Sequence, residues 1–77
     1  MTAKDAMEEF LFLGLRMLEG VKRTEFRDAF GVSLDEIYGE VIRRNIRDGL
    51  LADEGGRIYL TARGLDLSNY VMAQFLL

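Results

Sequence analysis

The sequence predicts a mainly helical domain that carries one short β-hairpin. Three features support this prediction: apolar residues recur at three- and four-residue spacings, glycines fall where these periodic stretches stop, and the period changes once, after Gly49. The chain has 77 residues, of which 49% are hydrophobic and 30% are charged. This balance is typical of a globular protein, and a chain this short has room for a single domain only.

The first helix is predicted from about Asp5 to Leu18. Apolar side chains recur through this stretch with good helix formers between them, and Gly20 stands where a left-handed residue would end the helix. A second, short helix is predicted from Thr24 to Phe30, because the Thr24 hydroxyl can accept hydrogen bonds from the amides that follow it. Gly31 is its expected stop.

Ser33 and Glu36 have the spacing of a capping box, which marks the start of a third helix. In this motif the Ser33 hydroxyl accepts a hydrogen bond from the Glu36 amide, and the Glu36 carboxylate accepts one from the Ser33 amide. Apolar residues then recur at helical spacing as far as Ile46, and Gly49 supplies the stop. These signals predict a helix of roughly fifteen residues.

Two short extended runs, at residues 50–53 and 57–60, flank the segment Glu54-Gly55-Gly56. A Gly-containing loop of about three residues between such runs predicts a β-hairpin. Thr61 can then cap a last helix that is rich in apolar residues to the end of the chain. Three helices, a two-stranded β-hairpin wing and a C-terminal helix are the elements of a winged helix-turn-helix domain.

The composition excludes several kinds of functional site. Without Cys the chain has no disulfide, no thiolate zinc site and no cysteine nucleophile, and without His it has no imidazole base. Adjacent carboxylate pairs such as Glu8-Glu9 and Asp35-Glu36 indicate solvated faces, because neighbouring residues on a helix point about 100° apart. We therefore predict no catalytic, cofactor-binding or metal-binding residue in this chain, and no enzymatic activity of its own.

The net charge of −3 gives no electrostatic attraction to nucleic acid. A free-standing winged-helix module that binds DNA or another protein is nevertheless the alternative function. Its third helix would enter the major groove, although the first half of that helix carries Asp35, Glu36 and Glu40, which repel phosphates. The DNA contacts in this alternative are Arg43, Arg44, Arg47 and Arg57.

The longest wholly apolar stretch, Phe10 to Leu15, is far below the roughly 20 residues that span a bilayer, so we predict no membrane span and a cytoplasmic location. The first and last helices are apolar on more than one side. Two explanations stay open. Each helix lies between two layers of its own domain, or its second face contacts another domain or subunit.

Three segments carry a resemblance to a known family. Residues 7–17 (MEEFLFLGLRM), 48–51 (DGLL) and 60–71 (LTARGLDLSNYV) resemble the C-terminal domain of radical S-adenosylmethionine proteins of the oxygen-independent coproporphyrinogen III oxidase family, within it the haem chaperone branch. The similarity covers nearly the whole chain. One departure is Ala62, where relatives often place Pro, which also suits the first turn of a helix.

The resemblance implies that residues 1–77 are a single domain excised from the C-terminus of a larger protein of porphyrin and haem metabolism. The N-terminal barrel of that radical SAM oxidoreductase-like parent would bind a 4Fe-4S cluster, S-adenosylmethionine and, in the chaperone branch, haem. This domain would be a non-catalytic accessory that packs on the barrel, helps to cover the tetrapyrrole site, or docks a haem-accepting protein. We expect the interdomain face to comprise Phe12, Leu15, Arg16, Tyr70 and Phe75.

Overall fold

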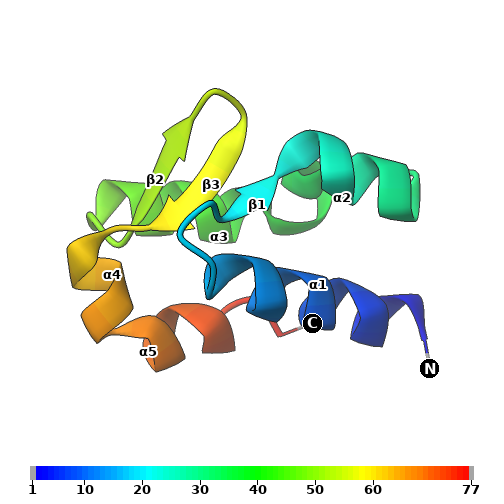
Figure 1. Cartoon of the computed structure of the whole chain (residues 1–77). Helices are drawn as coiled ribbons and strands as arrows, with labels where there is room; N and C mark the ends of the chain where they lie inside the picture. The colour runs from blue at the N-terminus through cyan, green and yellow to red at the C-terminus, as the bar shows by residue number, and fades with distance from the viewer. Residues whose placement is uncertain (1, 77) are drawn as a thin grey trace.

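The computed structural model describes residues 2–76 and is mainly helical, with a small antiparallel sheet (Figure 1). Over these residues the chain forms α1 (Ala3–Leu15), β1 (Val21–Lys22), α2 (Arg23–Phe30), α3 (Leu34–Arg47), β2 (Leu51–Glu54), β3 (Arg57–Leu60), α4 (Ala62–Asp66) and α5 (Ser68–Ala73).

The sheet joins the N-terminal part of the chain to the hairpin. Its strand order is β1–β3–β2, and the register pairs Val21 with Ile58 and Leu51 with Leu60. Helix α1 contacts β1 and β3, whereas α3 packs against β2. In Figure 1 the β2–β3 hairpin projects from the helices, and α4 and α5 carry the chain back toward α1.

One hydrophobic core lies between the sheet and the helices. It contains Leu11, Leu15, Val21, Phe26, Leu34, Tyr38, Ile42, Leu50, Leu51, Ile58, Leu60, Val71 and Phe75. An aromatic chain runs through it: the Phe26 ring lies 4.7 Å from that of Phe30 and 5.7 Å from that of Phe10, and the Tyr38 ring lies 5.1 Å from that of Phe75. Phe75 follows α5, so the end of the chain closes the core against α3.

A buried polar cluster fixes the end of α5 on α3. The side chain of Asn45 is fully buried, and its amide donates to the Val41 carbonyl at 2.8 Å and to Gln74 Oε1 at 3.1 Å. Gln74 Oε1 also accepts two hydrogen bonds from the Arg44 guanidinium, at 3.1 and 2.7 Å. Since a buried amide is costly without partners, these bonds specify how α5 docks.

The prediction for the segment between the first two helices is wrong in two places. Helix α1 ends at Leu15, not Leu18, and residues 16–20 form turns with hydrogen bonds from Met17 N to Gly14 O and from Gly20 N to Met17 O. Thr24 is not the cap of the second helix. Lys22 precedes α2 in an extended conformation, because it still belongs to β1, and no side chain caps this helix.

The start signal at Thr61 is confirmed, and the one at Ser33 is confirmed in part, since the hydrogen bond from the Ser33 amide to the Glu36 carboxylate is not formed. The Ser33 hydroxyl accepts from the Glu36 amide at 3.1 Å, and the Thr61 hydroxyl accepts from the Gly64 amide at 3.0 Å while donating to the Gly49 carbonyl at 2.7 Å. A complete capping box, Thr2 with Asp5, starts α1. Its Thr-x-x-Asp spacing is visible in the sequence.

The hairpin and the last helix differ in detail from the prediction. Glu54 belongs to β2, so the turn has two residues, Gly55 and Gly56, both with positive φ as tight hairpin turns require. The last helix is two helices, α4 and α5, which meet at Leu67, whose φ of −112° and ψ of 29° interrupt the helix.

The hydroxyl of Tyr38 is buried and has no hydrogen-bond partner among residues 2–76. Burial, with a smaller contribution from the negative charge of Glu8, raises the pKa of Tyr38 from 10.0 to about 12. Between these pH values the unfolded chain loses the phenol proton first. Any stabilisation from this group is therefore complete below pH 10 and falls as the pH rises toward 12.

We expect Tyr38→Phe to raise the free energy of unfolding by about 1 kcal/mol at neutral pH, because it removes an unpaired buried hydroxyl. The variant should also lose the part of the alkaline destabilisation that Tyr38 contributes. Urea unfolding at pH 7, 10 and 11 measures both effects. Tyr70→Phe is the matched control, since Tyr70 is exposed. A loss of stability in Tyr38→Phe at pH 7 would contradict the assignment.

Candidate docking surface beside helix α1

The five residues expected on an interdomain face differ in their exposure to solvent. Leu15 and Phe75 are 1% and 0% exposed, so they belong to this domain's own core and offer no surface to a second domain. Phe12 is half-buried against the core, whereas Arg16 and Tyr70 are exposed. Leu15 and Phe75 were misplaced because α1 and the last helix are apolar on several sides, which leaves the inward face undefined.

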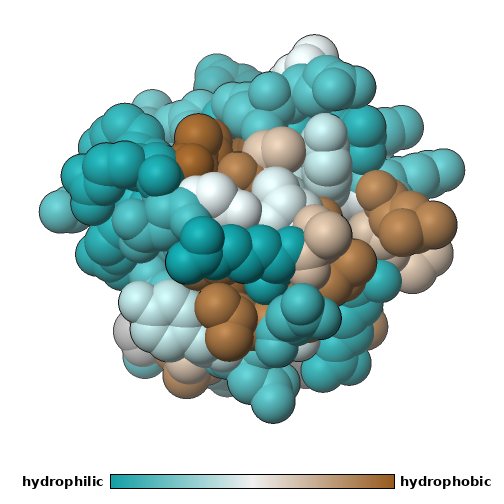
Figure 2. Space-filling model, turned by 90° about the vertical axis from the view of Figure 1, so that its left-hand side faces the viewer, coloured by the Kyte–Doolittle hydropathy of each residue, from teal (hydrophilic) through white to brown (hydrophobic). Residues whose placement is uncertain are grey.

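Other apolar side chains are exposed instead. They lie at the end of α1 and in the turn after it, at the end of α3, and along the segment from α4 to the end of the described chain: Leu13, Met17, Leu18, Ile46, Leu65, Leu67, Tyr70 and Leu76. Figure 2 shows that the apolar residues on one face form separate patches between hydrophilic ones. Leu18 is the most exposed of them at 88%.

A groove of about 260 Å³ lies beside the first of these groups, between α1, β1 and α2. It is lined by Phe10, Leu13, Gly14, Met17, Gly20, Val21, Lys22 and Glu25. Gly14 allows α1 to approach β1 closely, since a Cβ atom there would lie 2.6 Å from Val21 Cγ2. The missing side chains of Gly14 and Gly20 leave backbone in the groove wall, flanked by apolar side chains.

The groove has a charged rim and a limited size. Lys22 and Glu25 are exposed, and within residues 2–76 neither takes part in an ion pair. Sites that bury small molecules usually measure about 300–1,000 Å³. A groove of about 260 Å³ is therefore too small to enclose a tetrapyrrole and is better matched to a protein side chain.

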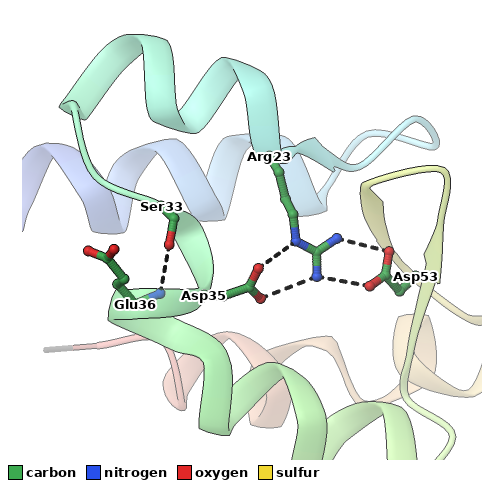
Figure 3. A network of polar contacts seen from close by, with 5 residues as sticks. All are labelled: Arg23, Ser33, Asp35, Glu36 and Asp53. Carbon is green, nitrogen blue, oxygen red and sulfur yellow. Dashed lines mark hydrogen bonds and ion pairs between the residues drawn. The ribbon is translucent and has the colours of Figure 1, made fainter.

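A second polar arrangement joins α2, α3 and the hairpin through Arg23 (Figure 3). Its guanidinium donates to both carboxylate oxygens of Asp35, at 2.8 and 3.3 Å, and to both of Asp53, at 2.9 and 2.8 Å. These hydrogen bonds raise the pKa of Arg23 above its usual range, and those to Asp53 contribute most. Two acidic residues that would repel DNA thus serve to hold three elements together.

The four arginines named for DNA contact have different surroundings. Arg43 is exposed, and Arg47 lies 4.0 Å from the Asp48 carboxylate. Arg44 is bonded to Gln74 as described above. Arg57 donates to the carbonyls of Leu18 and Glu19, at 3.3 and 2.9 Å, and its guanidinium lies 4.4 Å from the Tyr59 ring centre. Arg44 and Arg57 are thus engaged in contacts within the domain.

The family model described as the HemN C-terminal domain matches residues 1–67. This chain belongs to the HemN C-terminal domain family. It is 39% identical over 77 residues to the heme chaperone HemW of Lactococcus lactis subsp. lactis (strain IL1403), and 36% identical over 75 residues to the heme chaperone HemW of Bacillus subtilis (strain 168).

These matches cover 100% and 97% of this HemN C-terminal domain but only 20% of each HemW relative. The chain therefore spans about a fifth of the length of the curated relatives it matches. No solved structure matches it. The family resemblance inferred from residues 7–17, 48–51 and 60–71 is confirmed, including the haem chaperone branch.

The 4Fe-4S cluster that the family resemblance implies does not fit the residues of this HemN C-terminal domain. A 4Fe-4S cluster needs thiolate ligands, and the sequence has neither Cys nor His. Within residues 2–76 no three acidic side chains come together in a way that could hold a metal ion. Over the same residues, every helix is too short or too polar to cross a membrane. Over residues 2–76 this domain presents a set of exposed apolar side chains and the groove beside α1.

Proposed function

We propose that this chain is a non-catalytic accessory domain of a HemW-like haem chaperone, the C-terminal part of a longer radical SAM protein. The observation that carries the proposal is the 39% identity over the whole chain to a fifth of a HemW protein. The absence of Cys supports it, because a cluster-bearing barrel elsewhere in the polypeptide would supply the iron ligands. This domain would contribute packing surface and no reacting group.

We propose further that the fold is a winged helix. Helices α2 and α3 are joined by the three residues 31–33, the β2–β3 hairpin follows as a wing, and β1 adds a short third strand. In this architecture the ion pairs of Arg23 hold the wing to the start of α3. The arrangement supports a domain used for protein contacts, because Asp35 at the start of α3 and Asp53 in the wing put negative charge on the two elements that would have to approach phosphates.

The exposed apolar groups would serve to pack this domain beside the radical SAM barrel. Leu13 and Met17 at the end of α1, and Leu65 and Leu67 at α4, are large apolar side chains that solvent contacts in the domain taken alone. Apolar surface of this kind is typical of an interface. Packed against the barrel, the domain would help to cover its tetrapyrrole site, and it would leave a surface on which a haem-accepting protein could dock.

Hydrogen–deuterium exchange tests this function. The domain is compared within its complete native polypeptide and as the separate 77-residue chain, whose folding is first checked by circular dichroism. We expect slower exchange in the complete polypeptide along at least one of the two exposed apolar regions, α1 or α4–α5, and no bound iron in the separate chain after incubation with iron and sulfide. Equal exchange throughout the domain, or a native gene without a cluster-binding barrel, would refute the proposal.

A further inference from the structure

We infer that the groove between α1, β1 and α2 receives one apolar side chain from the part of the same HemW-like polypeptide that lies outside this domain. The inference rests on the proposed function and specifies the surface through which the domain docks. None of the residues first expected on the interdomain face lines this groove, whose walls include Phe10, Leu13 and Met17.

The shape and lining of the groove select the occupant. A cavity of about 150 Å³ with an apolar lining is enough to hold a benzene molecule, so a groove of about 260 Å³ accommodates one large aliphatic or aromatic side chain. Gly14 and Gly20 expose backbone at its wall, which lets a second chain approach more closely than side chains would permit. Leu13 and Met17, both more than half exposed, line the groove and would cover the inserted group.

The small size of the site argues for an occupant on the same polypeptide. A stable complex between separate proteins usually buries about 800 Å² on each partner, which would be a sixth of the 4811 Å² of accessible surface of this domain. The groove and the two exposed side chains beside it are a small contact by that measure. A covalent link supplies an effective concentration in the millimolar range, so a small contact suffices. In each relative about four fifths of the polypeptide lies outside the matched segment and is covalently linked to it.

The charges at the rim of the groove indicate which charges we expect on the segment that carries the inserted apolar residue. Lys22 and Glu25 both line the groove, and neither takes part in an ion pair within the described part of the chain. An incoming segment with an acidic residue beside Lys22 and a basic residue beside Glu25 would satisfy both. The expected occupant is therefore an apolar residue flanked by opposite charges.

Cysteine labelling in the complete native polypeptide tests the inference, because this domain has no cysteine of its own. Met17→Cys places a thiol at the groove, and Glu36→Cys places a matched control thiol on the exposed start of α3. The maleimide labelling rate at each site is measured by peptide mass spectrometry in buffer and in urea. We expect labelling of the Met17→Cys site to be at least tenfold slower in buffer than in urea, and that of Glu36→Cys to change less than twofold.

Two additional measurements test whether the occupant is apolar and whether it belongs to the same polypeptide or to a second copy of the chain. Adding Leu13→Asp should restore fast labelling at the Met17→Cys site, because a buried carboxylate disfavours an apolar occupant. Tenfold dilution should leave the protection unchanged, whereas protection by a second copy of the chain would weaken. Unprotected labelling at the groove, or protection that is lost on dilution, overturns the inference. If exchange slows at α4–α5 while the groove labels freely, the inference fails and the proposed function stands.

Discussion

Phe26→Ala is expected to lower the free energy of unfolding by about 3–5 kcal/mol. Phe26 is fully buried, and its ring contacts those of Phe10, Phe30 and Tyr38, which come from α1, α2 and α3. Truncation leaves a cavity where three helices meet. A domain of this size has a total stability of about 4–12 kcal/mol, so the variant should lose a substantial fraction of it.

Urea unfolding followed by circular dichroism measures this effect. Leu18→Ala is the matched control, because Leu18 is a large apolar residue that is almost fully exposed. We expect the control to change the free energy of unfolding by less than about 0.5 kcal/mol. A loss below 1 kcal/mol for Phe26→Ala would show that α1, α2 and α3 do not share the core described above.

Gly20→Ala should have the second large effect, a loss of about 3 kcal/mol or more, through backbone geometry. Gly20 has a φ of +74°, and a Cβ atom on it would collide with the carbonyl oxygen of Ile58 in β3. The substitution must therefore push β1 away from β3 or change the turn after α1. Either change disturbs the pairing of Val21 with Ile58 and the groove beside it.

Gly31→Ala separates the cost of the left-handed conformation from the cost of the collision with Ile58. Gly31 has nearly the same φ, +73°, but a Cβ atom there meets no other atom within 4 Å. Its cost is the left-handed conformation alone, about 1–2 kcal/mol. Thermal and urea unfolding of both variants give the difference that the collision contributes. Equal losses for Gly20→Ala and Gly31→Ala would mean that β1 lies farther from α1 and β3 than the structure places it.

The elements with strong local signals were predictable from the sequence. Helix α3 has a capping residue at Ser33, apolar residues on one side and a glycine after its end, and its predicted bounds agree with the structure. Thr61 marked the start of α4 for the same reason. Such signals act within four residues of the chain, so they do not depend on the rest of the fold.

The remaining features depend on contacts between distant parts of the chain. Strand β1 has only two residues, too few to show an alternating pattern, and it forms because β3 offers an edge 37 positions further on, as in the pairing of Val21 with Ile58. The ion pairs of Arg23 likewise join residues 12 and 30 positions apart. Neither feature is indicated by the residues next to it in the sequence.

The candidate site was missed because α1 is apolar on more than one side. Helical periodicity then does not indicate which side of the helix faces the core. The sequence therefore does not distinguish Leu15, which is buried in the structure, from Leu13, which is exposed. One signal could have helped. Gly14 and Gly20 bracket the end of this apolar helix, and glycines at a close helix–strand approach leave a hollow beside it.

The position of Phe75 also determines when the domain can fold during synthesis. Its ring completes the aromatic core beside Tyr38, and Gln74 next to it satisfies the buried amide of Asn45. A nascent chain that has emerged only as far as α4 lacks both groups. Tyr38 and Asn45 lack these partners from the time they emerge until Gln74 and Phe75 follow some thirty residues later, which takes about 1.5–6 seconds at 5–20 residues per second. Core closure must therefore follow, not accompany, emergence of the helices and the hairpin from the ribosome.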